Sequence, residues 1–318
     1  MTSSPAASLP PELLFEIFSQ FEDVEGEADQ QSLKHATLVC RAWADPAQSV
    51  LWQSGATLEG DDDVRKFIRT APRRRVGPKD ISIFNLRRVE LLDALWPHVE
   101  GIETLLVGSQ GGVISAETFE HSALSDLTAL SVKGSLIASS PSVRLPFQLS
   151  RLIIEDEGIR TRHLASFIST IAQNSTSTLR SLSLLSISRP SHADVANAVL
   201  PFAPTLRHIG LSVSKDDAAA FVPVFESATM LKSFECTSLP LPLLHALPLS
   251  LVGFATGEDA GGIDTAQLKI ALDRLPRLST LYFTFPRSHV QDIRGGLELV
   301  SEFEKRGVVW KFLDDYRD

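Results

Sequence analysis

Apolar residues recur in a fixed short pattern along most of this 318-residue chain. An apolar residue is followed by two others, a second apolar residue, one other and a third apolar residue, as in Leu179, Leu182 and Leu184. The pattern returns about every 25 residues, at intervals of 20 to 30, within the range of structural repeats. The instances begin at Ile102, Leu127, Leu149, Leu179, Leu206, Leu231, Leu251 and Leu278, with Ile81–Ile83 as the expected start of the series and Val308–Phe312 as its expected end.

Segments with the apolar spacing of a helix lie between these strand patterns. A strand and then a helix, repeated without a return hairpin, predicts parallel strands stacked into a curved solenoid of the α/β class. A doubly wound sheet has the same alternation and is the alternative, although it usually has fewer units and no fixed strand motif. The expected helical segments are 89–99, 115–124, 159–173, 193–202, 216–228, 265–275 and 290–305.

The first fifty residues have helical rather than strand spacing. Leu13, Leu14, Ile17, Phe18 and Phe21 form one apolar stripe, and a proline ahead of them suits a helix start. A second helix is expected from residue 31 to residue 43. Two short helices bury little surface alone, so part of this apolar area must meet the rest of the chain or a partner. The other interpretation is that they are core helices of an ordinary helical domain.

The sequence LPPELLFEIF from Leu9 to Phe18, with TLVCRAW from Thr37 to Trp43 and a closing Leu51–Trp52, resembles an F-box. The resemblance implies docking on a Skp-type adaptor and, through it, on a cullin/RING ubiquitin ligase. Residues 22–31 form a longer and more acidic connection than the family usually has, which leaves the placement of the two helices open. The implied adaptor-binding residues are Leu9, Pro10, Leu13, Leu14, Ile17, Phe18, Leu38, Val39, Cys40 and Trp43.

The later repeats resemble, over residues 80–312, those of fungal-type F-box proteins with leucine-rich repeats. They lack the asparagine that regular repeats place after the strand, so an irregular arc is expected. The expected organisation is an F-box module at 1–60, a linking helix and turn at 61–79 that includes Arg73–Arg75, and a leucine-rich-repeat-like domain at 80–318.

Side chains alternate along a strand, so the residues flanking the two buried positions of each strand should face outward on the concave side. Three such positions in each of nine strand patterns make 27 outward residues, and sixteen of them are Gly, Ala, Ser or Thr. Small residues could reflect tight curvature, or could form a shallow groove for another protein, and both interpretations stay open. The candidate target-binding residues are Phe84, Leu106, Arg151, Ile153, Glu155, Leu185, Glu235 and Tyr282.

The net charge of −9 is uneven, because residues 1–60 carry −7 and the remainder only −2. Neither part shows a basic stripe in sequence, which argues against a nucleic-acid partner. Cys40 and Cys236 are read as buried thiols, which suits a reducing compartment, cytoplasmic or nuclear. The apolar window 239–255 contains prolines and is too short to span a membrane, so no membrane partner is expected.

Motifs for catalysis, metal binding or nucleotide binding are absent from the sequence. Gly108–Gly112 lacks the lysine of a phosphate loop and is interpreted as the turn after a strand. We therefore expect no cofactor, no metal and no enzymatic activity. The expected function is a substrate-recognition subunit of an SCF-type ligase that binds an unknown protein target. The alternatives are an F-box scaffold without a ubiquitin role and an enzyme whose site is not visible in motifs.

Overall fold

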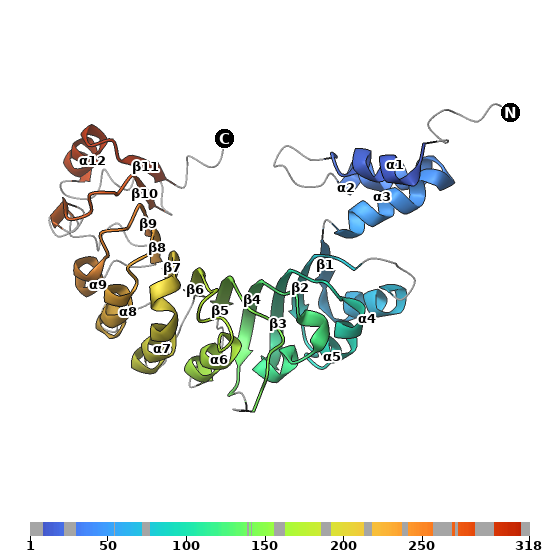
Figure 1. Ribbon diagram of the computed structural model, residues 1–318, viewed down its shortest axis with the longest axis horizontal. Coiled ribbons are helices and arrows are strands. Elements are labelled where there is room, and N and C mark those ends of the chain that lie inside the picture. The colour runs from blue at the N-terminus through green and yellow to red at the C-terminus, as the bar shows by residue number, and fades with distance from the viewer. Residues whose placement is uncertain are drawn as a thin grey trace.

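The computed structural model is an arc of parallel strands with helices along its outer side (Figure 1). Three further helices stand at the N-terminal end of the arc. The structure describes residues 9–21, 30–53, 55–71, 77–138, 140, 142–155, 163–185, 192–212, 218–236, 241–256, 269–270, 273–283 and 296–312.

The N-terminal group consists of α1 (Pro11–Phe18), α2 (Gln30–Val39) and α3 (Arg41–Gln53). Pro11 occupies the first helical turn of α1, where its missing amide costs no hydrogen bond, and Glu12 lies beside the positive helix end. The expected single helix 31–43 is instead two helices separated at Cys40. Leu33 of α2 and Trp43 of α3 both pack in the cluster around Phe18. The chain turns between them because one straight helix could not bring both side chains to that cluster.

The described part of the chain forms an 11-stranded sheet in which strand order follows chain order and every pair is parallel. A doubly wound sheet reverses its order at a switch point, so that alternative is wrong. The expected α/β solenoid arrangement is therefore confirmed. The strands are β1 (Ala56–Glu59), β2 (Asp80–Leu86), β3 (Thr104–Ile114), β4 (Ala129–Leu136), β5 (Arg151–Glu155), β6 (Ser181–Leu185), β7 (His208–Leu211), β8 (Ser233–Cys236), β9 (Gly253–Thr256), β10 (Thr280–Phe283) and β11 (Val309–Phe312).

Helices connect most successive strands: α4 (Gly60–Thr70), α5 (Leu91–Leu95), α6 (Leu164–Ile171), α7 (His192–Val199), α8 (Val222–Ser227), α9 (Leu241–Ala246) and α12 (Gly296–Lys305). The expected helix at 115–124 is two short 3-10 segments, because few residues separate β3 from β4. The sequence did not predict α9. Residues 156–162, 213–217, 265–268 and 284–295 of the expected turns and helices lie outside the described residues.

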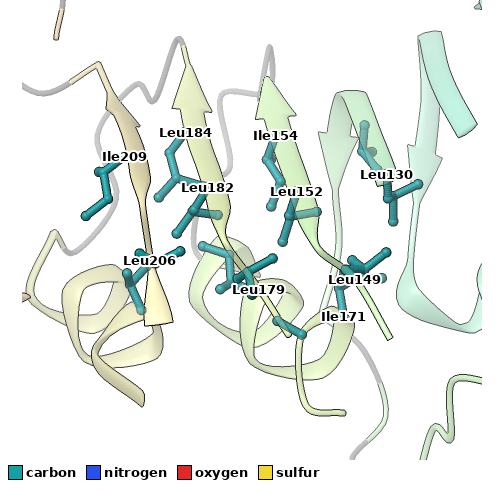
Figure 2. Close-up of a cluster of buried hydrophobic side chains, with 14 of the residues drawn as sticks. Leu130, Leu149, Leu152, Ile154, Ile171, Leu179, Leu182, Leu184, Leu206 and Ile209 are labelled. Carbon is teal, nitrogen blue, oxygen red and sulfur yellow. The ribbon is translucent and has the colours of Figure 1, made fainter. Parts of the chain in front are cut away.

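Leucine, isoleucine and valine fill the space between the sheet and the outer helices in continuous rows. Leu152, Leu182 and Ile209 lie opposite one another on β5, β6 and β7 and are buried (Figure 2). Leu179 and Leu206 form a second buried row just before the strands begin. The buried apolar residues of successive repeats belong to one continuous cluster, which is how a solenoid builds its core.

The sheet begins earlier than the sequence indicated. β1 pairs with β2 from Ala56 to Glu59, so the parallel sheet starts at Ala56 rather than at Ile81. The expected linking helix is α4, which lies between two strands and buries Val64 and Phe67 in the core of the sheet. It therefore serves as the helix of a repeat. Residues 72–76, with Arg73–Arg75, lie outside the described residues.

Two smaller expectations are also wrong. The glycine-rich segment 108–112 is not a simple turn, because β3 continues through it with a register shift against β4. A Cβ on Gly112 would lie 2.6 Å from the hydroxyl of Ser109 and 2.8 Å from a methyl group of Val89, so any other residue would force these side chains to shift. Cys40 is half-buried at the break between α2 and α3, whereas Cys236 is buried as expected.

Candidate protein-interaction surfaces

The three N-terminal helices close a small core of their own. Leu14 and Phe18 of α1 are buried against residues of α2 and α3. The ring of Phe18 meets those of Trp43 and Phe21 edge to face, with centroids 5.3 Å and 5.6 Å away. Leu14 and Phe18, which the sequence placed on an adaptor surface, hold this core and are not accessible to a partner.

Other residues of the same predicted set are exposed although they are large and apolar. Leu13 and Ile17 are 47% and 45% exposed on α1, and Leu38 and Val39 are 81% and 61% exposed at the end of α2. Pro10 is exposed as well, whereas Leu9 is half-buried against the core. Exposed apolar side chains beside a closed core are typical of a surface that another protein covers.

The concave face of the sheet carries the predicted target-binding residues in registered rows. Leu106, Ile153, Glu235 and Tyr282 belong to one row that runs across the sheet from β3 to β10. Each is partly exposed, as the alternation of side chains required.

These residues do not form one site. Arg151, Ile153, Glu155 and Leu185 are neighbours on β5 and β6, whereas Phe84 and Leu106 lie on β2 and β3, and Glu235 and Tyr282 on β8 and β10. The carboxylate of Glu155 already pairs with Lys133 Nζ at 3.0 Å, so it is less available to orient a partner than the sequence suggested.

His208 is the centre of a polar group on this face that the site prediction omitted. Its Nδ1 lies 2.8 Å from the hydroxyl of Ser233, and its Nε2 lies 3.4 Å from that of Ser183. A Cβ on Gly210 would lie 2.8 Å from the Ser183 hydroxyl, so the glycine leaves room for that side chain. The strand alternation did place His208 on the outward face, which was the only available indication.

Burial of the imidazole lowers the pKa of His208 below its usual 6.5; Glu235 acts in the opposite direction, and Arg151 adds to the lowering. At a pH between the pKa of His208 in the unfolded chain and its lower pKa in the folded protein, the unfolded chain binds more protons. The stability of the fold therefore falls as the pH drops through this range. We expect the melting temperature of the wild type to fall more between about pH 7 and pH 5 than that of His208→Asn. Equal pH dependence in thermal melts of the two proteins would contradict this.

A polar cleft of about 520 Å³ opens beside the ends of β1 and β2 and the middle of β3. Asp61 fixes one wall, since its carboxylate accepts hydrogen bonds from the amides of Arg87 and Arg88 at 2.9 Å and 3.2 Å. Partial burial acts to raise the pKa of Asp61, but those bonds and the nearby arginines outweigh it and the pKa is lowered. The lining residues are Glu59, Gly60, Asp61, Asp62, Arg65, Asn85, Arg87, Arg88 and Gln110. The lining contains three acidic residues and three arginines, so their formal charges cancel.

Comparison with known proteins gives a family for the N-terminal segment. A family model described as F-box-like matches residues 6–55, which contain α1, α2 and α3. Residues 6–55 are therefore an F-box-like domain, a type that typically mediates protein interaction rather than catalysis. No curated protein matches the chain. The chain is also similar to a Bacteroides fragilis protein, a structural genomics target whose crystal structure is known. The two sequences are 15% identical, the match covers 81% of this chain and 73% of that chain, and the TM-score is 0.44.

No helix in the part of the chain that the structure describes has the length and apolar character needed to cross a membrane. No group of three or more His, Cys, Asp or Glu side chains in the described ranges could hold a metal ion.

Proposed function

We propose that this chain is a substrate-recognition subunit of an SCF-type cullin ubiquitin ligase. The F-box-like domain would bind a Skp-type adaptor, and the repeat sheet would bind a target protein. One observation carries the proposal: within the segment that matches the F-box-like model, large apolar side chains stay exposed beside a core that is already closed. A helical module that packed only against the rest of its own chain would not need to leave these side chains uncovered.

Adaptor binding tests the proposal through an exposed residue. Ile17→Asp should lower co-purification of a Skp-type adaptor at least tenfold, because an apolar contact at the centre of an interface contributes about 2 kcal/mol or more. Ile17 lies outside the core, so circular dichroism should show an intact fold. Glu16→Gln, an exposed neighbour on the same helix, is the matched control and should keep adaptor binding. Undiminished binding by a folded Ile17→Asp variant would end the proposal for this surface.

The fate of the bound protein distinguishes a ligase subunit from an F-box scaffold without a ubiquitin role. Affinity purification with and without a proteasome inhibitor should show a partner that accumulates on the wild type when degradation is blocked. That partner should be captured by Ile17→Asp without the inhibitor, because this variant keeps the repeat sheet but loses the ligase. A partner whose amount is the same in all these samples would favour the scaffold.

A further inference from the structure

A line of backbone hydrogen bonds joins the residues that immediately precede each strand. The amide of Arg207 donates to the carbonyl oxygen of Arg180 at 2.7 Å, and the amide of Lys232 donates to that of Arg207 at 2.8 Å. The same bond links Val252 to Lys232 and Ser279 to Val252. Equivalent side chains therefore stand one strand apart, about 4.8 Å, along this edge of the sheet.

Three successive positions of that line are cationic: Arg180, Arg207 and Lys232, here named the basic ladder. They lie 27 and 25 residues apart in the chain, so no sequence window shows them as a cluster. Arg207 and Lys232 are exposed, and Arg180 is half-buried with its guanidinium donating to the carbonyl of Thr205 at 3.4 Å. None of the three forms an ion pair with any residue that the structure describes.

Like charges side by side across a sheet destabilise it. The same line shows the stabilising arrangement at its N-terminal end, where Lys79 pairs with Glu103 on the next repeat at 2.7 Å. Other positions of the line carry neutral hydroxyl residues, such as Ser150 and Ser279. Three consecutive cations are therefore not required by the fold, and their repulsion would be relieved by an anionic partner.

Apolar side chains adjoin the ladder on the same edge. Met230, Leu249 and Val252 are 47%, 61% and 36% exposed, and the hydroxyl of Ser250 donates to Leu231 at 2.7 Å, which brings the two turns together. An acidic peptide with apolar residues can use both parts of this surface. A nucleic-acid backbone would use only the cations, and the chain as a whole carries −9.

We infer that the basic ladder docks an acidic segment of a partner protein along the strand-start edge of β6, β7 and β8. The inference rests on the proposed role of the repeat sheet in binding a target, and it specifies the chemistry of the segment that is bound. Carboxylates spaced one helical turn apart, about 5.4 Å, would match the spacing of the ladder.

A labelled peptide of twelve glutamates is the probe, measured by fluorescence anisotropy against the full chain at low salt. Replacing all three ladder residues by serine, the residue type already present at positions 150 and 279, should weaken binding at least tenfold. The matched control removes three exposed cations elsewhere, Arg69→Ser, Arg87→Ser and Lys305→Ser, and should change the affinity less than threefold. Arg207→Ser alone should raise the melting temperature, because it relieves the repulsion.

Three results would overturn the inference: no binding of the glutamate peptide to the wild type, equal losses in the ladder and control variants, or tighter binding of a twelve-nucleotide thymidine oligomer than of the peptide. Adaptor co-purification is measured on the same samples. If the wild type binds the adaptor but not the peptide, only the inference about the basic ladder is refuted. If the wild type does not bind the adaptor, the proposed function is refuted.

Discussion

Leu182→Asn is expected to destabilise the repeat sheet by about 3–5 kcal/mol, because it removes a fully buried leucine and places a polar amide in the apolar core. Leu182 lies at the centre of the sheet, opposite Leu152 and Ile209 on the neighbouring strands (Figure 2). Its loss would break the continuous core between two repeats. Thermal denaturation followed by circular dichroism measures the effect.

Leu185→Asn on the same strand is the matched control, since it makes the same chemical change on the concave face. We expect it to cost less than about 1 kcal/mol, because Leu185 is only half-buried. Asparagine is preferred to aspartate because Leu185 lies opposite Glu155, whose charge would repel a second carboxylate. Equal destabilisation by the two variants would mean that the two faces of the strand are assigned wrongly, as a shift of one residue would cause.

Phe18→Ala should unfold the F-box-like domain while the repeat sheet stays folded. Phe18 is fully buried and holds the rings of Trp43 and Phe21, so removing it costs about 3–5 kcal/mol. A domain of about fifty residues has little stability in reserve. Hydrogen exchange should therefore become fast over residues 30–53 and remain slow over β4 to β7.

Ile17→Ala is the control for this experiment, because Ile17 is the adjacent residue on α1 but is exposed. Its exchange pattern should match that of the wild type. If Phe18→Ala also accelerated exchange throughout the sheet, the three helices would not fold as a separate unit.

The sequence by itself determined the class of the fold. The motif that places Leu179, Leu182 and Leu184 at fixed spacing defines which side chains are buried, and its return without hairpins requires parallel strands. The sequence also located the F-box-like segment, because the two motifs that carry the resemblance, LPPELLFEIF and TLVCRAW, are local patterns. These features depend on neighbouring residues along the chain, which is why a sequence shows them.

What the sequence left undecided depends on distant contacts. The stripe on α1 does not say which of its members face the other helices, so Leu14 and Phe18 were grouped with Leu13 and Ile17. β1 is only four residues long and becomes recognisable as a strand through its pairing with β2.

The basic ladder was invisible for the same reason. Arg180, Arg207 and Lys232 each stand alone among neutral or apolar neighbours in sequence, and the sequence accordingly showed no basic stripe. Only the stacking of successive repeats brings the three to one edge of the sheet. Charge repulsion falls off with distance in space rather than along the chain, so the tertiary structure alone decides where such charges gather.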